Sequence, residues 1–150
     1  MAKLTGNVWI DGPVEAVEAV GVDVAGWPAW VPSLQRADVS PGFPAPGETA
    51  ALALRQMGFT LHMTLRVRER TPGQSIVFEM AGRFVNGLNT WTFAPQDGGT
   101  LVTCVMAFDI PGGPAGEGVY RRLVGPLLAR ALEEILTNLA DRVEGPAEPG

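Results

Sequence analysis

Apolar and polar residues alternate with a period of two through the middle of the chain, between residues 48 and 109. In one stretch Leu61, Met63 and Leu65 occupy every second position, and His62 lies among the polar residues between them. Successive side chains of a β-strand point to opposite faces of a sheet, so this alternation predicts a strand with one buried and one solvated face. His62 is expected on the solvated face, which argues against a role as a general base.

Turn-forming sequences divide this region into separate strands. Thr71–Gln74 and Gln96–Gly99 contain the proline, glycine and aspartate residues that favour tight turns. No helical pattern lies between the strands, so they predict an antiparallel meander and not a parallel sheet. The charged residues of the segment 66–70, Arg70 included, are expected to face solvent. The predicted strands are Lys3–Ile10, Leu34–Ser40, Glu48–Met57, Phe59–Arg70, Ile76–Ala81, Arg83–Ala94 and Thr100–Asp109.

Two short helical segments are predicted after the first strand. Asp11 and Pro13 are typical of a helix start, and they predict a helix from about Pro13 to Ala25. The following segment, Gly26–Pro32, contains two prolines four residues apart, which excludes a long regular helix. We expect a tight connector or a single helical turn there.

A wide apolar stripe marks the last long segment, Gly118–Val143. Its apolar residues recur at spacings of three and four, which predicts an amphipathic helix that covers a large apolar surface. The stripe drifts around the helix between its early and late parts. Pro126 explains the drift, because a proline cannot donate the helical hydrogen bond to the carbonyl of Arg122. We therefore expect a kinked or two-piece helix, with the later part, Pro126–Val143, lying across the sheet.

Composition excludes several classes of function. The chain has 150 residues, which suits one core, and a formal net charge of −5. It therefore lacks the overall positive field that would hold nucleic acid or an anionic membrane. The single cysteine, Cys104, excludes an internal disulfide and a thiolate metal cage within one chain, and we expect no metal or cofactor. Short, interrupted apolar runs and the absence of a signal-peptide pattern predict a cytoplasmic protein without integral membrane association.

The order of these parts resembles a known superfamily. The helix that opens with Pro13-Val14-Glu15, the helical turn within Val22–Pro32, the meander with its Asp97–Thr100 turn and the terminal helix together resemble the START-like helix-grip superfamily called SRPBCC. Within it, the chain is similar to the small bacterial polyketide cyclase/dehydrase and lipid-transport group. The resemblance implies an α+β helix-grip fold, in which a curved antiparallel sheet of about seven strands wraps around a long C-terminal helix. It also implies two short helices between strands 1 and 2, and a cavity between sheet and helix. We expect a single domain over residues 1–144 and a disordered tail over 145–150.

The buried faces of the predicted strands and helix supply a candidate lining for such a cavity. Methionine packs adaptably and aromatic rings offer flat apolar surfaces, so this wall suits a ring-containing or acyl ligand. The same pattern also describes an ordinary filled core. The apolar candidates are Met57, Phe59, Met63, Phe78, Met80, Trp91, Phe93, Cys104, Met106, Phe108, Leu123 and Leu127, and the polar candidates that would contact a ligand are Arg55, Arg83 and Tyr120.

Other polar and aromatic residues have two interpretations each. Asn86 and Asn89 either face solvent or reach a ligand carbonyl or hydroxyl from the centre of a strand. Trp27 and Trp30 either border an entrance or fill the gap between the short helices and the sheet. Cys104 has no basic neighbour in the sequence and is expected to fill space rather than to act as a nucleophile.

The function that follows is binding or transport of a small hydrophobic ligand, such as a lipid, quinone or polyketide-like molecule. The loop Ile110–Gly118 and the region of Pro126 would form a gate. One alternative is a polyketide cyclase or dehydratase, which needs a polar constellation inside the cavity. A second is a protein-interaction module, which needs an apolar patch or groove at the connector Trp27–Leu34. The ligand, any catalysis, and the choice between monomer and homodimer stay open.

Overall fold

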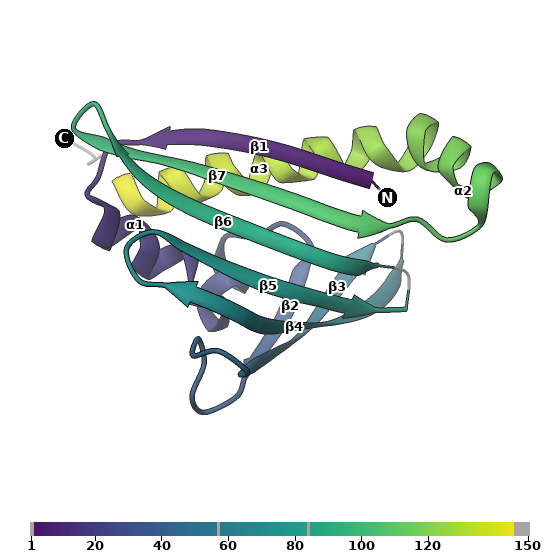
Figure 1. Ribbon diagram of the computed structural model, residues 1–150, viewed down its shortest axis with the longest axis horizontal. Coiled ribbons are helices and arrows are strands. Elements are labelled where there is room, and N and C mark those ends of the chain that lie inside the picture. Colours follow the sequence, from purple (N-terminus) through teal and green to yellow (C-terminus); the bar gives the residue numbers. More distant parts are fainter. Residues whose placement is uncertain (1, 57, 84, 146–150) are drawn as a thin grey trace.

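The computed structural model describes residues 2–56, 58–83 and 85–145, so Met57 and the predicted tail beyond Gly145 lie outside the described residues. The strands form one antiparallel sheet in the order β1-β7-β6-β5-β4-β3-β2, and a long helical segment follows the last strand (Figure 1). The predicted α+β helix-grip fold is confirmed. The strands are β1 (Ala2–Ile10), β2 (Leu34–Val39), β3 (Thr49–Gln56), β4 (Phe59–Thr71), β5 (Ser75–Gly82), β6 (Asn86–Gln96) and β7 (Gly99–Asp109). The helical elements are α1 (Val14–Gly21), the 3₁₀ helix η1 (Val24–Ala29), α2 (Gly113–Val119), the π-helical turn η2 (Tyr120–Val124) and α3 (Gly125–Glu144).

The period-two pattern places one set of residues on the inner face of the curved sheet, toward the helices. In β5, Ile76, Phe78 and Met80 are buried, whereas Glu79 and Ala81 are exposed. The same alternation holds in β6 and β7, where the residues predicted to share a face do so. The hydrophobic pattern therefore assigns the inner face correctly in these strands, because one face of each strand packs on the core.

One inserted residue changes the alternation in β4. The pairing between β4 and β5 shifts register between Val67 and Glu69, and beyond it Arg70 lies opposite the buried residue Ile76. A bulge of this kind reverses which residues face inward. The prediction that Arg70 faces solvent is therefore wrong.

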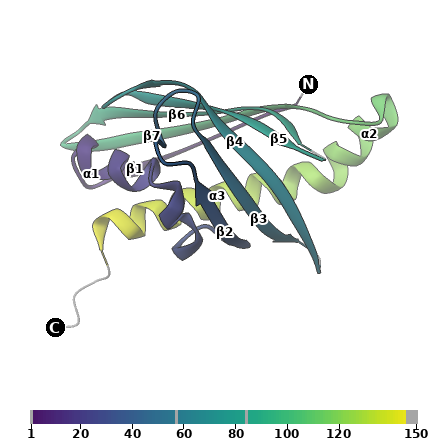
Figure 2. The same cartoon turned by 90° about the horizontal axis from the view of Figure 1, so that it is seen from below.

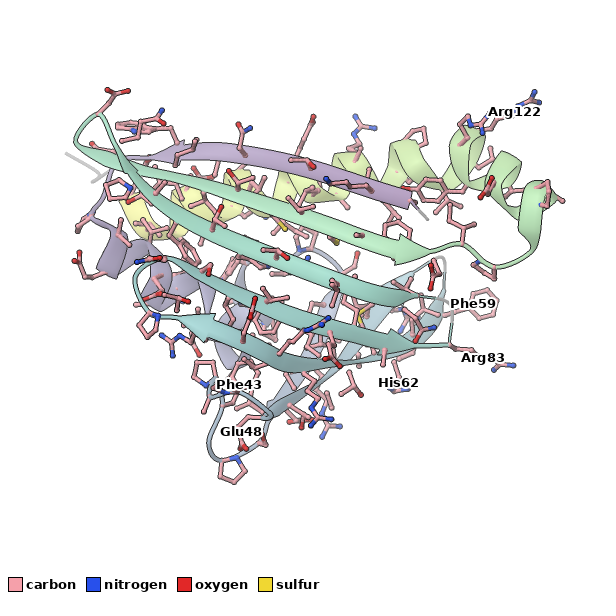
Figure 3. The ribbon with its side chains drawn as sticks, in the orientation of Figure 1. Phe43, Glu48, Phe59, His62, Arg83 and Arg122 are labelled. Atoms are coloured by element: carbon pink, nitrogen blue, oxygen red, sulfur yellow. The ribbon has the colours of Figure 1, made fainter. Side chains whose placement is uncertain are left out.

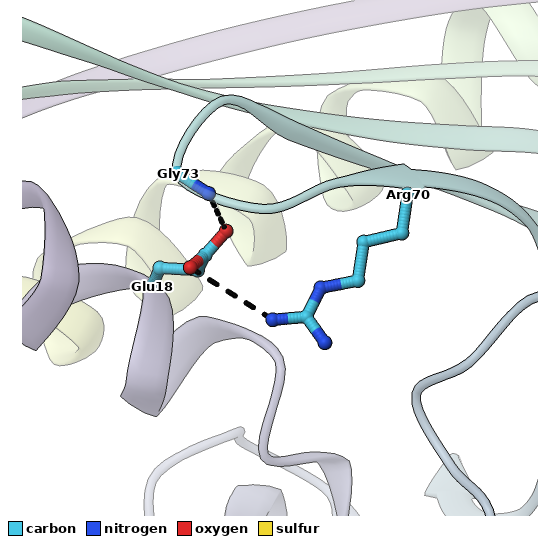
Figure 4. A network of polar contacts seen from close by, with 3 residues as sticks. All are labelled: Glu18, Arg70 and Gly73. Carbon is cyan, nitrogen blue, oxygen red and sulfur yellow. Dashed lines mark hydrogen bonds and ion pairs between the residues drawn. The ribbon is translucent and has the colours of Figure 1, made fainter.

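Arg70 joins a polar contact that ties α1 to the turn between β4 and β5 (Figure 4). One carboxylate oxygen of Glu18 accepts a hydrogen bond from the backbone N–H of Gly73 at 2.6 Å, and the other lies 3.8 Å from Nη2 of Arg70. Both charged side chains are largely buried. The contact positions the first helix against the end of the sheet.

Replacing Glu18 by alanine is expected to lower the free energy of unfolding by about 1–3 kcal/mol, because it leaves a backbone N–H and a partly buried guanidinium without their acceptor. Urea denaturation measures the change. Glu15→Ala is the matched control, since Glu15 is an exposed glutamate on the same helix, and it should change the free energy by less than about 0.5 kcal/mol. Equal effects of the two substitutions would contradict a structural role for the Glu18 contact.

The first helix is shorter than the sequence predicts. α1 ends at Gly21 instead of Ala25, and the separate 3₁₀ helix η1 follows. A Cβ atom on Gly21 would lie 3.2 Å from the ring of Phe93, so the close contact with β6 favours glycine at this helix end. Around Pro28 the chain forms the short 3₁₀ helix η1 and no long regular helix, as expected.

The terminal helical segment is divided as predicted, and the structure shows how. The backbone N–H of Gly125 bonds to the carbonyl of Tyr120, five residues earlier, which makes the π-helical turn η2. This wider turn directly precedes Pro126, whose missing N–H would break a regular α-helical ladder. The predicted loop Ile110–Gly118 is only partly a loop, because α2 occupies Gly113–Val119.

The later half of α3 is the part that packs on the sheet. A Cβ atom on Gly6 of β1 would lie 2.9 Å from Cδ1 of Leu136 and 3.0 Å from Cδ2 of Leu132, so the absent side chain lets the helix approach the strand. Leu139 is fully buried further along. The two ends of the molecule therefore differ (Figures 1 and 2): α1 and the end of α3 lie at one, which we call the α1 end, and α2 with the β3–β4 and β5–β6 turns lies at the other, the α2 end.

Candidate ligand-binding site

Aromatic side chains close the inner face of the sheet toward the α1 end. The ring of Trp27 lies 6.0 Å from that of Trp30, 6.1 Å from that of Phe78 and 6.1 Å from that of Trp91. Phe43 stacks on Phe78 with ring centroids 6.2 Å apart. Phe78 is 0 % exposed, so no water-sized space adjoins it. Trp27 and Trp30 are buried too, which favours packing over an entrance role.

Two residues of the inner face toward the α2 end, Met63 and Met106, are only half-buried. Near them, Met80, Asn89 and Phe108 are 5–6 % exposed, as buried as Trp27 and Trp30 at the α1 end. We call these five residues the open wall. They come from four adjacent strands, because Met80 lies next to Leu65 of β4 and Asn89 lies opposite Met106 of β7. The aromatic cluster fills the inner face at the α1 end, and within the open wall only Met63 and Met106 are half-buried.

Asn89 is the polar member of this wall and is only 6 % exposed. The indole N–H of Trp91 donates a hydrogen bond to Oδ1 of Asn89, and Nδ2 of Asn89 lies 3.5 Å from Sγ of Cys104. An indole nitrogen is only a donor, so this contact fixes which end of the carboxamide is its oxygen. The amide nitrogen, with two hydrogens, has a weak sulfur acceptor as its partner. The arrangement therefore offers a ligand a hydrogen-bond donor within an apolar wall.

Cys104 lies next to the open wall, on the same face of β7 as Met106, and is 1 % exposed. Burial raises the pKa of its thiol from 9.0 to about 12, and the hydrogen bond from Asn89 lowers that pKa by less. A thiol of this kind is not a nucleophile near neutral pH. The expectation that Cys104 fills space agrees with this environment.

Alkylation of Cys104 by iodoacetamide at pH 8 is expected to be at least about a thousandfold slower than that of free cysteine, and to become fast when urea unfolds the protein. The thiol ionises near pH 9.0 in the unfolded chain and near pH 12 in the folded one, so the folded state should lose stability as the pH rises through this window. Below pH 9.0 this group contributes no pH dependence. Rapid alkylation of the folded protein would contradict the buried position of Cys104.

The helical side of the site is built by η2 and the start of α3. The ring of Tyr120 packs edge-on against Phe108 with centroids 5.5 Å apart, and burial raises the pKa of its hydroxyl above 10.0. Leu123 and Leu127 are both 64 % exposed, so they do not pack on the sheet. Apolar side chains on the helix and on the sheet thus remain uncovered at the same end of the molecule.

The structure distributes the predicted ligand-binding residues over three environments. Phe78, Trp91, Phe93 and Cys104 are part of the packed core, and Met63, Met80, Met106, Phe108 and Tyr120 lie at or beside the open wall. The exposed residues are Arg55, Phe59, Arg83, Leu123 and Leu127, while Met57 lies outside the described residues. Figure 3 shows Phe59, His62 and Arg83 near the α2 end, and His62 is exposed as predicted.

The sequence left two interpretations open for Asn89, a solvent-facing residue or one that reaches a ligand. The signal was present, since Asn89 has the same parity in β6 as Trp91 and Phe93, which were assigned to the buried face. Its partner Cys104 becomes apparent only from the pairing of β6 with β7. Asn86, three residues earlier, is exposed and donates to the carbonyl of Gly82.

Two surface hollows are lined by residues other than those of the open wall. One, of about 320 Å³, runs between β1 and the outer side of α3 and includes Thr5, Asn7, Glu133 and Thr137. The other, of about 620 Å³, is a wide depression between Pro28–Pro32 and the α3 residues Asn138, Asp141 and Arg142. Within the described residues there is no group of three or more histidine, cysteine or carboxylate side chains placed to hold a metal ion.

The fold and the apolar inner face define a START-like helix-grip protein. The chain belongs to the polyketide cyclase/dehydrase and lipid transport family, whose model matches residues 1–144. No curated protein matches the chain. In the described part of the chain, no helix is both long enough and apolar enough to span a bilayer.

Solved structures with the same fold come from several organisms. The protein TTHA0849 from Thermus thermophilus is 21 % identical, with a TM-score of 0.79 over 95 % of this chain and 97 % of the other. The Zhui aromatase/cyclase from Streptomyces sp. R1128 is 15 % identical, with a TM-score of 0.75 over 95 % and 93 %. A START superfamily protein from Mycobacterium smegmatis is 16 % identical, with a TM-score of 0.74 over 95 % and 97 %. At these identities the likeness establishes the fold alone.

Proposed function

We propose that the protein binds a small hydrophobic ligand carrying a carbonyl or hydroxyl oxygen, between the open wall and the η2–α3 segment. The observation that carries this proposal is the open wall itself: apolar residues with one buried amide donor, opposite a helix whose leucines stay exposed. Burial of apolar surface would supply most of the affinity, and the Asn89 amide would orient the oxygen. The family's description, which includes lipid transport, supports the same class of ligand.

The gate predicted from the sequence belongs to this proposal. Gly112 and Gly113 have φ values of 93° and 60°, a conformation that favours glycine, and they join β7 to α2. Movement of α2 and η2 about this joint would change access to the open wall. Hydrogen exchange compares the free and ligand-bound states, and equal protection of residues 110–128 in both would contradict the gate.

Titration with N-phenyl-1-naphthylamine, an uncharged probe that fluoresces in apolar surroundings, tests the binding function. We expect saturable binding of one probe per chain, together with a co-purifying small molecule in native mass spectra. Met80→Trp should abolish probe binding, because the larger ring fills the open wall, whereas Val39→Trp on exposed β2 should not. Absence of saturable binding to the unmodified protein would contradict the proposal.

A cyclase or dehydratase receives less support from the site. Its polar candidates Arg55, Arg83 and Asn86 are exposed, and Tyr120 packs against Phe108. Asn89 alone does not make an acid–base pair, because a carboxamide does not titrate. The likeness to an aromatase/cyclase therefore supports the fold and not the reaction.

One specific observation supports a protein-interaction role. The depression beside Pro28–Pro32 coincides with the connector where such a groove was expected. Its rim is held by a hydrogen bond from Nδ2 of Asn138 to the carbonyl of Trp30, at 2.8 Å. A partner that binds there would protect η1 and the end of α3, at the α1 end and away from the open wall.

A further inference from the structure

Exposed apolar side chains gather at the α2 end on two separate parts of the fold. Phe59 at the β3–β4 turn is 72 % exposed, and Val119, Leu123 and Leu127 on the helical segment are 53–64 % exposed. We call these four residues the end patch. Figures 1 and 2 place the β3–β4 turn and α2 at the same end of the long axis, and Figure 3 shows Phe59 there. Large apolar side chains exposed together on a folded protein are typical of an interaction surface.

The same end is positively charged although the whole protein is acidic. The ends of β3 and β7, the β5–β6 turn, α2 and η2 carry four arginines, Arg55, Arg83, Arg121 and Arg122, against two carboxylates, Asp109 and Glu117. This local charge of +2 within a chain of −5 leaves −7 on the remainder. The four arginines are exposed. The overall negative charge argued against an anionic membrane as a partner. It conceals a difference in charge between the α2 end and the rest of the protein.

We propose that the α2 end docks on the surface of an anionic phospholipid bilayer. The end patch would enter the boundary between head groups and acyl chains, and the surrounding arginines would contact lipid phosphates, a combination typical of interfacial binding. The acidic remainder would be repelled from the same surface, which orients the molecule with its open wall nearest the bilayer. A second copy of this chain fits the surface less well, because a symmetric contact would bring arginines against arginines.

Ligand-free protein and vesicles test the docking apart from the proposed ligand site. Sedimentation with phosphatidylcholine vesicles containing 30 % phosphatidylglycerol is expected to remove protein from solution at low salt, while pure phosphatidylcholine vesicles remove little. Each arginine lost from the surface should weaken binding about fivefold, so R121S/R122S should weaken it about 25-fold. The same variant should retain binding of N-phenyl-1-naphthylamine, since both arginine side chains are exposed and the η2 residue that contacts the open wall is Tyr120, through Phe108.

One further double variant and two single-residue controls separate the apolar and charged contributions from general effects. L123S/L127S removes apolar surface that is already exposed and should abolish sedimentation with native circular dichroism retained. Val39→Ser and Arg142→Ser are the controls, because Val39 lies on β2 and Arg142 near the end of α3, and neither should change sedimentation.

Failure of the unmodified protein to sediment with the anionic vesicles would overturn the docking proposal, whether or not the probe binds. So would a stable dimer in light scattering that L123S/L127S converts to monomer, because the end patch would then be covered by a second copy.

Discussion

Phe78→Ala is expected to lower the free energy of unfolding by about 3–5 kcal/mol, the range for a phenylalanine removed from a packed core. Phe78 is fully buried, with Trp27 and Phe43 against its ring. The surrounding aromatic rings cannot collapse fully into the space, so a cavity cost adds to the lost apolar burial. Urea denaturation monitored by tryptophan fluorescence measures the loss.

Phe59→Ala is the matched control for this substitution. Phe59 lies on the neighbouring strand β4 but is 72 % exposed, so its removal should change stability by less than about 0.5 kcal/mol. A small effect of Phe78→Ala, similar to that of Phe59→Ala, would mean that the α1 end of the inner face is not a closed core. The ligand could then also bind at the α1 end, and the open wall would not be the one candidate site on the inner face.

Asn89→Leu is expected to abolish recognition of the ligand oxygen. Two matched probes measure this: 2-acetylnaphthalene has a carbonyl acceptor and 2-ethylnaphthalene has none. The unmodified protein should bind the ketone about tenfold more tightly than the hydrocarbon, a difference of about 1.4 kcal/mol, and Asn89→Leu should bind both equally. A preference for the ketone that survives in the variant would contradict the assigned role of Asn89.

The variant also removes the acceptor of a buried indole N–H, that of Trp91. Its stability should therefore fall by about 1–3 kcal/mol, which must be measured beside the affinities. Asn86→Leu is the control, because Asn86 is exposed on the same strand and should change neither property.

The fold was predictable from periodicity because each strand has one face against a common core. The alternation of Ile76, Phe78 and Met80 identifies the inner face, and the wide stripe with Pro126 identifies a divided terminal helix. Arg70 was misassigned because a bulge adds one residue without a glycine or proline signal in the sequence. α1 ends at Gly21, where a Cβ atom would lie 3.2 Å from the ring of Phe93, and this tertiary contact is not visible in the local sequence pattern.

The site was less predictable than the fold. The alternation of residues assigns Phe78 and Met80 to the same face of β5. Only the three-dimensional packing shows that aromatic rings cover Phe78, whereas Met80 belongs to the open wall. The pairing of Asn89 with Trp91 and Cys104 depends on side-chain contacts across strands. The exposure of Leu123 and Leu127 depends on where α3 leaves the sheet, which no local pattern specifies.

The distribution of charge was also not predictable from the sequence. Net charge is a property of composition and gave −5, whereas the position of Arg121 and Arg122 beside exposed leucines is a property of the fold. A ligand site open toward a bilayer surface would let an apolar molecule pass between membrane and protein with little exposure to water.

The indole N–H signals of the four tryptophans give the most direct test of ligand binding at the open wall. Proton–nitrogen correlation spectra should be recorded while 2-acetylnaphthalene is added. The account predicts that the Trp91 signal shifts most, because its N–H bonds to Asn89, and that the signal of Trp9, which donates to the carbonyl of Gln96, stays in place. A spectrum in which Trp9 or Trp30 shifts while Trp91 does not would contradict it.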